Sequence, residues 1–401
     1  MDRNKKVCIF GLGYIGLPTA ALLANSGYQV LGVDVKQEII DTINRGEIHI
    51  IEPDLDAFVH AAVHSGNLKA DLDPTEADIF IIAVPTPFHE DLSPNISYVL
   101  EAARSLASKV KPGNLIILES TSPVGTTEKI QAELIQLGVD TDNLHFAYCP
   151  ERVLPGHIMK ELIENDRIIG GITKESTKKV ADFYKTFVKG AVLETNSRTA
   201  EMCKLTENAS RDVNIAFANE LSMICDPLEI NVWELISLAN KHPRVNILRP
   251  GTGVGGHCIA VDPWFIVSQS PDTAKIIKQA REVNNFKTQW VIEKIINTCL
   301  RFRIENKKKP KLACLGLAFK PDIDDLRESP ALEVVERLIS EKIDCMVVEP
   351  NIESHPKMKL VELEEAIEKA DIVVVLVGHK PFKNVSFKES GIVLDFVGLN
   401  V

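Results

Sequence analysis

A glycine-rich turn at a predicted strand–helix junction constrains the fold of this chain more than any other feature. Val7–Phe10 is predicted to be a short buried strand, and Gly11-Leu-Gly13-Tyr14-Ile15-Gly16 follows it directly. An apolar helix is then predicted from Leu17 to Ser26, and a second strand ends on Asp34, eighteen residues after the last glycine. In this context, a Gly-x-Gly-x-x-Gly motif indicates a dinucleotide-binding, parallel α/β fold.

Each residue of the motif has a physical task. Gly11 makes the tight turn, Gly13 lets a pyrophosphate approach the backbone, and Gly16 lets the helix pack on the strand. The N–H groups at the start of the helix face the phosphates, so Tyr14 and Ile15 are expected beside the cofactor. Asp34 accepts hydrogen bonds from ribose hydroxyls and repels a 2′-phosphate, so the sequence favours NAD over NADP.

Polar residues follow several later strands. Buried strands are predicted at Asp78–Val84, Leu115–Leu118 and Ala147–Pro150. Open α/β sheets bind ligands at the carboxyl ends of their strands. The candidate contacts at these ends are Thr86, Ser120, Thr121, Glu151 and Arg152. The alternative for the hydroxyl residues is that they only shape the turns.

One long helix is predicted from Ser197 to about Cys225, because no glycine or proline interrupts this stretch. Its polar residues at helical spacing are Glu201, Lys204, Asn208 and Arg211, and its opposite face carries Met202, Leu205, Ala209, Val213 and Ala216. The polar stripe is either a solvated face or the lining of a ligand site. In the second case, Lys204 and Asn208 project side by side.

A second glycine-rich stretch, Gly251-Thr-Gly-Val-Gly255-Gly-His-Cys258-Ile-Ala-Val-Asp262-Pro263, has little helix or strand character. Glycines at this density let a backbone run close to a ligand. Cys258, with Asp262 four residues later, is placed like a nucleophile beside a carboxylate that handles water. The alternative is that the cysteine is a small buried apolar residue. Arg244 and Arg249 precede the stretch and suit a diphosphate or carboxylate ligand.

The length, net charge and cysteine content of the chain limit its possible functions. With 401 residues, the chain suits two or three domains, and we expect an NAD-binding domain at 1–196, a central helical domain at 197–304 and a Rossmann-like domain at 305–401. The net charge of −11 argues against nucleic-acid and membrane-surface partners. The eight cysteines lack zinc or disulfide spacing, and we see no signal peptide or membrane span. We therefore expect no metal and a cytoplasmic location.

Taken together, the motifs resemble those of the UDP-glucose/GDP-mannose dehydrogenase family of nucleotide-sugar 6-dehydrogenases, along essentially the whole chain. The stretches that carry the resemblance are 11–18, 119–125, Pro150-Glu151, Lys204 with Asn208, 255–262 and 319–329. Within the family, the stretches 46–54, 151–156, 242–248 and 258–264 resemble the branch that oxidises UDP-N-acetyl-D-mannosamine. The UDP-glucose branch usually carries a lysine at the position of Val261 and an acid at that of Pro155, and both departures argue against UDP-glucose.

The resemblance implies two doubly wound domains joined by a helical region, and a four-electron oxidation at C6 of the sugar with NAD. Cys258 would form a thiohemiacetal and then a thioester, while Lys204 favours the thiolate. Lys204 and Asn208 would stabilise oxyanions, and Asp262 or Glu151, with help from Thr121, would handle water. The implied substrate contacts are Glu151, Arg152, Val153, Lys204, Asn208, Arg211, His242, Arg244, Gly255 and Lys320, and Arg327 is an implied cofactor contact. A homodimer or higher homo-oligomer is also implied, in which Arg244 can be shared across subunits.

Three alternatives stay open. A sister enzyme would act on UDP-N-acetyl-D-glucosamine. A β-hydroxyacid-type dehydrogenase would perform a single oxidation and would have no use for Cys258. A non-catalytic NAD-binding sensor would bind the cofactor without turnover.

Overall fold

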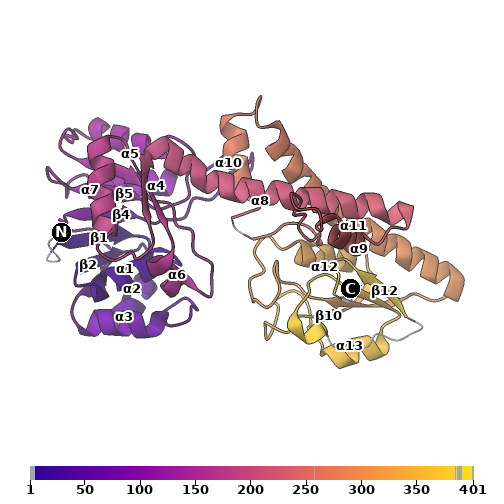
Figure 1. Ribbon diagram of the computed structural model, residues 1–401. Coiled ribbons are helices and arrows are strands. Elements are labelled where there is room, and N and C mark those ends of the chain that lie inside the picture. Colours follow the sequence, from indigo (N-terminus) through magenta and orange to yellow (C-terminus); the bar gives the residue numbers. More distant parts are fainter. Residues whose placement is uncertain (1–4, 257, 384, 386–390, 400–401) are drawn as a thin grey trace. The chain divides into compact units, whose positions relative to one another are not determined.

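The computed structural model describes residues 5–256, 258–383, 385 and 391–399 (Figure 1). The chain divides into two compact units, Met1–Thr206 and Glu207–Val401. Among the described residues, no helix combines the length and the apolar character needed to cross a membrane.

The first unit is a doubly wound α/β domain around one sheet. Its strands are β1 Lys6–Phe10, β2 Gln29–Val33, β3 Leu68–Asp71, β4 Ile79–Ile82, β5 Leu115–Leu118, β6 His145–Tyr148, β7 Arg167–Gly171 and β8 Val192–Asn196. The order across the sheet is β3-β2-β1-β4-β5-β6-β7-β8. All neighbours are parallel except β6 and β7, which pair antiparallel. The strand order changes direction between β1 and β4, because β2 and β3 are added on one side of β1 and the later strands on the other side. Doubly wound folds bind ligands at such a switch point.

Helices connect these strands and cover the sheet. They are α1 Gly16–Asn25, α2 Gln37–Asn44, α3 Leu55–His64, α4 Ser97–Leu106, α5 Thr126–Gln136, α6 Ile158–Glu164 and α7 Lys174–Tyr184, and the long α8 Ser197–Cys225 follows β8. The side chains of strand β1 explain why helices must cover both faces of the sheet. Val7 and Ile9 belong to one hydrophobic core, and Cys8 and Phe10 belong to another. Since alternate side chains leave a strand on opposite faces, the strand is apolar throughout.

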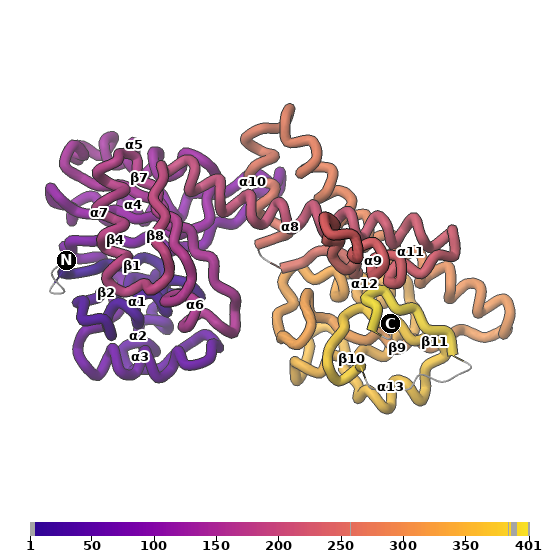
Figure 2. Tube along the Cα trace, viewed as in Figure 1, coloured from indigo at the N-terminus to yellow at the C-terminus, as the bar shows by residue number. Residues whose placement is uncertain are grey.

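The second unit continues α8 with helices and ends in a smaller sheet (Figure 2). Its helices are η1 Asp226–Leu228, α9 Val232–Ala239, α10 Asp262–Gln269, α11 Lys275–Asn306, α12 Pro330–Ser340, α13 Leu363–Lys369 and η2 Lys380–Phe382. Its strands are β9 Lys311–Leu315, β10 Asp344–Val348, β11 Ile372–Val375 and β12 Ile392–Asp395, in the parallel order β10-β9-β11-β12. Side-chain caps begin α9 and α12, where Asn231 and Ser329 accept backbone N–H groups.

The predicted fold class is confirmed, with two doubly wound sheets and a long helix between them in the sequence. The limits of α8 agree with the prediction. The predicted polar and apolar faces of α8 are partly wrong. Glu201 is buried, whereas Met202 is exposed, because α5 of the first unit packs against the start of α8 and supplies polar partners there. The division into three domains stays a prediction.

Candidate active site

The glycine turn has the geometry that a dinucleotide requires. Gly11 has a φ of +85°, and a Cβ there would lie 2.7 Å from the carbonyl oxygen of Ala83. A Cβ on Gly16 would lie 1.8 Å from the carbonyl oxygen of Gly11, so α1 needs glycine to approach the turn. Gly13 is exposed, and a Cβ there would meet no atom within 4 Å. The space beside Gly13 is therefore open to a ligand, while the other two glycines serve close packing.

Asp34 follows β2 and holds this turn in place. Its carboxylate accepts hydrogen bonds from the backbone N–H groups of Leu12 (3.0 Å) and Lys36 (3.1 Å). Tyr14 is exposed and Ile15 half-buried beside the turn. His49 lies close to Asp34; burial lowers the pKa of the His49 ring, although Asp34 opposes that shift. None of the sequence motifs assigns a role to the His49 side chain.

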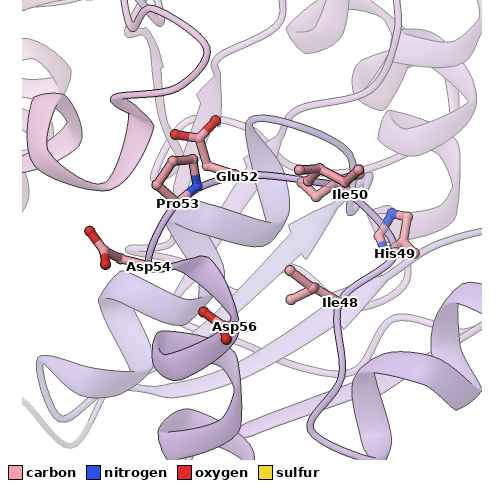
Figure 3. A pocket seen from close by; sticks show the side chains of 8 residues that line it. Ile48, His49, Ile50, Glu52, Pro53, Asp54 and Asp56 are labelled. Carbon is pink, nitrogen blue, oxygen red and sulfur yellow. The ribbon is translucent and has the colours of Figure 1, made fainter. Parts of the chain in front are cut away.

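The segment around His49 forms a pocket that the motifs did not predict (Figure 3). It is lined by residues 48–54, which lie between α2 and α3, and by Asp56 in the first turn of α3. Within this segment, Glu52 accepts the backbone N–H groups of Gly156 and Ile158, each at 2.8 Å. Glu52 therefore ties the segment to the start of α6.

Two of the hydroxyl residues at the strand ends donate hydrogen bonds to the backbone of the protein. Thr86 donates its hydroxyl to the carbonyl oxygen of Thr121 (2.6 Å), and Ser120 donates to that of Val84 (2.7 Å). These bonds tie the end of β4 to the end of β5. The hydroxyl oxygens keep acceptor capacity for a ligand. Thr121 is half-buried.

Glu151, predicted as a substrate or water contact, follows β6 and is buried. The Arg167 guanidinium donates to its Oε2 (2.6 Å), and the backbone N–H of Arg152 donates to its Oε1 (2.6 Å). The ion pair orients the carboxylate and keeps its charge compensated. Arg152 and Val153 are half-buried beside it.

A second acid, Glu119, lies at the same edge of the sheet, at the end of the neighbouring strand β5. Glu119 follows β5, is 3% exposed, and accepts the Tyr184 hydroxyl at 2.5 Å. Burial raises the pKa of Glu119 to about 7, with a further contribution from Glu151, while Arg167 and Tyr184 act in the opposite direction. The signal was available, because Glu119 stands directly at a strand end in the sequence.

Asp262 and Asn208 form a polar contact within the second unit. Asp262 begins α10 and is 4% exposed, and the Asn208 side-chain amide donates to its carboxylate at 2.5 Å. Lys204 lies one turn before Asn208 on α8 and is half-buried, so both project from the same side of the helix. Arg211, the next residue of the predicted stripe, is exposed.

Cys258 is exposed, so the alternative that it is a buried apolar residue is wrong. Its carbonyl oxygen accepts the backbone N–H groups of Val261 (3.1 Å) and Asp262 (2.9 Å). Cys258 therefore lies in the turn that leads into α10, four residues before Asp262. His257, part of the quoted motif, lies outside the described residues.

The glycines before Cys258 serve packing within the second unit. A Cβ on Gly255 would lie 2.3 Å from the carbonyl oxygen of Glu328, and one on Gly256 would lie 2.8 Å from the Phe319 ring. The Gly256 N–H also donates to the carbonyl oxygen of Arg327 (3.2 Å). The protein's own 319–330 segment fills this space, so the small residues bring the thiol loop and that segment together.

The predicted anion-binding cations differ in their surroundings. Arg249 donates to the carbonyl oxygen of Gly398 (3.1 Å) and lies over the Trp233 ring, so it has a structural task. Arg327 forms an ion pair with Asp325 (2.6 Å) on its own loop. The other candidates, His242, Arg244 and Lys320, are exposed.

These features define a class before any comparison. A glycine turn at a helix N-terminus, an acid after β2 and a polar edge at the switch point are those of a dinucleotide-binding enzyme of the doubly wound type. In the part of the chain that is described, no group of three or more His, Cys, Asp or Glu side chains is arranged to hold a metal ion.

Comparison with known proteins identifies the family. Three models of the UDP-glucose/GDP-mannose dehydrogenase family match this chain: the NAD binding domain at residues 5–188, the central domain at 198–286 and the UDP binding domain at 313–398.

Similar individual proteins cover the chain from end to end. A UDP-N-acetyl-D-mannosamine dehydrogenase of Campylobacter jejuni is 56% identical over 95% of this chain and 97% of its own length. An NDP-N-acetyl-D-galactosaminuronic acid dehydrogenase of Ralstonia solanacearum is 52% identical over 100% of this chain and 98% of its own length. Among solved structures, a UDP-D-ManNAc dehydrogenase from Pyrococcus horikoshii has a TM-score of 0.88 at 38% identity and covers 98% of this chain and 96% of that one.

The chain therefore belongs to the UDP-glucose/GDP-mannose dehydrogenase family. It is an NAD-dependent dehydrogenase of a UDP-sugar.

Proposed function

We propose that this enzyme oxidises C6 of UDP-N-acetyl-D-mannosamine twice, from alcohol through aldehyde to acid, and supplies UDP-N-acetyl-D-mannosaminuronic acid for bacterial surface polysaccharide. The observation that carries the proposal is the 56% identity to the Campylobacter jejuni UDP-N-acetyl-D-mannosamine dehydrogenase across 95% of the chain. We also propose a cytoplasmic location, which a nucleotide-sugar substrate suits.

NAD, when bound, accepts the hydride in each oxidation, and Gly11, Gly13, Gly16 and Asp34 are the residues that would hold it. After the first oxidation, the Cys258 thiolate attacks the aldehyde carbon to form a thiohemiacetal with a new C–S bond. The second oxidation converts this adduct to a thioester. Water then cleaves the C–S bond, which gives the acid and returns the thiol.

The polar residues stabilise the oxyanions and activate the water. Lys204 and Asn208 donate to the oxyanions that form at C6, a contribution of about 3 kcal/mol per donor in comparable sites. The hydrogen bond from Asn208 to Asp262 supports a shared task of these two residues at the oxyanion and the water. Glu151, held by Arg167, is the second candidate to activate water, and Thr121 assists at the strand end.

The remaining candidate residues account for contacts with the nucleotide-sugar and with NAD. We propose that Arg152, Val153, Arg211, His242, Arg244, Gly255 and Lys320 contact the substrate, and that Tyr14, Ile15, Thr86, Ser120 and Arg327 contact NAD. We further propose that the enzyme is a homodimer or a higher homo-oligomer in which Arg244 is shared across subunits.

Two other substrates compete with this proposal. UDP-N-acetyl-D-glucosamine differs from the proposed substrate only in its configuration at C2. The N-acetylgalactosamine series is favoured by the similarity to the Ralstonia solanacearum dehydrogenase. The test is to incubate the enzyme with NAD and each UDP-sugar separately and to count NADH. Two NADH per N-acetylmannosamine substrate, with slower turnover of the other sugars, supports the proposal. One NADH per sugar would instead indicate a single oxidation, and NAD binding without turnover would indicate a sensor.

Replacing Cys258 tests the covalent step. The variant Cys258→Ser lacks the thiolate, so we expect the rate of two-NADH turnover to fall by about 10³-fold or more. NAD binding, measured by fluorescence titration, should be unchanged because the glycine turn and Asp34 are intact. Retention of a near-normal rate would exclude the thioester mechanism.

A further inference from the structure

A group of buried polar side chains lies at one edge of the first sheet. It contains two carboxyl groups but one guanidinium, so one carboxylate would lack a compensating cation if both were ionised. This edge cluster consists of Glu119, Cys149, Glu151, Arg167 and Tyr184, and all five are buried. They come from the ends of β5 and β6, from β7 and from α7.

Strand pairing brings these residues together. β5 and β6 are parallel neighbours, and the backbone N–H of Cys149 donates to the carbonyl oxygen of Leu118 (2.9 Å), so Glu119 and Glu151 follow adjacent strands at the same edge. β7 runs antiparallel to β6, which returns Arg167 to the edge where β6 ends. Tyr184, the last residue of α7, reaches the same place.

The cluster holds two carboxyl groups and one guanidinium. Arg167 donates to Glu151 at 2.6 Å and to the carbonyl oxygen of Leu162 at 3.1 Å. Glu119 accepts the Tyr184 hydroxyl on Oε1, and its Oε2 has no hydrogen-bond partner among the described residues. A buried carboxylate without a cation of its own is costly, so the favoured state has Glu151 ionised and Glu119 protonated.

We propose that Glu119 is a positioning residue that controls how strongly Arg167 holds the Glu151 carboxylate. While Glu119 is neutral, Arg167 compensates the charge of Glu151 alone, and the ion pair holds the Glu151 carboxylate tightly. When Glu119 loses its proton, the same cation faces two carboxylates, so its hold on Glu151 weakens and Glu151 is freer to take a proton from the water that cleaves the thioester. The proposal rests on the function proposed above, in which Glu151 activates that water.

The other members of the cluster act on the ionisation of Glu119 in opposite directions. Burial is the largest cause that raises the pKa of Glu119 to about 7, and Glu151 adds to it, whereas Arg167 and the Tyr184 hydroxyl oppose it. Burial also raises the pKa of the Cys149 thiol, so this group stays neutral and adds no charge to the cluster. Since the two carboxyls interact, their ionisation is that of a pair.

An infrared titration tests the protonation directly and needs no substrate. The full-length enzyme should show a carboxylic-acid carbonyl band that disappears as the pH rises through about 7. The band should be missing at all pH values in Glu119→Gln. In Tyr184→Phe the titration should move to higher pH, because the hydroxyl that stabilises the ionised form is lost. Absence of the band from the wild type, or its persistence in Glu119→Gln, would overturn the proposal.

A single-turnover experiment tests the effect on Glu151. With labelled UDP-sugar and acid quenching, decay of the protein-bound thioester should accelerate about tenfold between about pH 6 and about pH 8 in the wild type. Glu119→Gln should show the slow rate throughout this range, and Tyr184→Phe should show the acceleration at higher pH. The same acceleration in Glu119→Gln as in the wild type would overturn the proposal.

Two controls separate this effect from other titrations. Glu175→Gln makes the same change on an exposed acid of α7 and should leave the acceleration unchanged. Lys287→Met removes another group with a pKa of about 7 and should also leave it unchanged. If the wild type makes no NADH from any UDP-sugar, the proposed function fails, whereas the infrared titration still decides whether Glu119 is protonated.

Discussion

At the residue scale, Lys287 is a buried cation of the second unit. It is 2% exposed, donates to the Ser222 hydroxyl at 2.8 Å, and lies 4.1 Å from the centre of the Trp290 ring. Burial lowers the pKa of Lys287 to about 7; Asp226 opposes this shift and Lys294 adds to it. The pKa of Lys287 is thus lower in the folded protein than in the unfolded chain. Burying the charged lysine therefore lowers the free energy of unfolding by its full amount below about pH 7, and this loss disappears as the pH rises toward about 10.5.

Lys287→Met should therefore raise the free energy of unfolding at about pH 6, by on the order of 3–5 kcal/mol less the lost hydrogen bond and ring contact. The gain should shrink steadily as the pH rises toward 10. Urea unfolding of both proteins across this range measures the difference. A gain that does not depend on pH would show that the lysine charge is not its cause.

At the scale of elements, Glu201 joins α8 to the start of α5. The residue that precedes α5 is Gly125, which has no side chain to cap the helix. The Glu201 carboxylate accepts the backbone N–H groups of Gly125 (2.6 Å) and Thr127 (2.8 Å) as well as the Thr127 hydroxyl (2.7 Å). An acid from a distant part of the chain thus satisfies the unpaired N–H groups of this helix.

Glu201→Ala should lower the free energy of unfolding by about 2–4 kcal/mol, because it leaves buried donors without partners. Glu220→Ala, on an exposed position of the same helix, should change it by less than about 0.5 kcal/mol. Thermal and urea unfolding provide the comparison. Equal losses in the two variants would mean that helix propensity, not the contact with α5, is responsible.

At the scale of the whole molecule, exposed apolar residues on the second unit support self-association. Large apolar side chains on the C-terminal half of α8, on η1 and α9 and just beyond are exposed: Phe217, Ile224, Leu228, Ile230, Leu238 and Val245. Large exposed apolar patches are typical of protein–protein interfaces. Leu238→Asp should therefore shift the sedimentation coefficient from that of an oligomer to that of a monomer. An unchanged value would place the interface elsewhere.

The sharing of Arg244 can be tested by mixing two inactive variants. If Arg244 completes the site of a neighbouring subunit, hybrids of Cys258→Ser and Arg244→Ala chains contain one intact site. A dimer mixture refolded together should then recover about a quarter of the wild-type rate. No recovery would mean that Arg244 acts within its own subunit, and an active Arg244→Ala protein would mean that Arg244 is not required.

The sequence by itself determined the dinucleotide-binding start of the chain and the extent of α8. The turn between β1 and α1 depends on backbone freedom at Gly11 and Gly16, and a helix continues while no residue interrupts its hydrogen bonds. These are local properties, so they can be predicted from neighbouring residues. Cys258 and Asp262 were also identified locally, as a thiol and an acid in one short loop.

Only the tertiary structure decided which charges meet. Glu119 contacts Tyr184 across 65 positions of the chain, and Glu201 reaches Gly125 across 76. The antiparallel β7, which brings Arg167 to Glu151, reverses the direction that the preceding strands predict. Spacing along the chain carries no information about such pairs, because strand order and helix packing set their distances, and those distances determine which carboxyl keeps its proton.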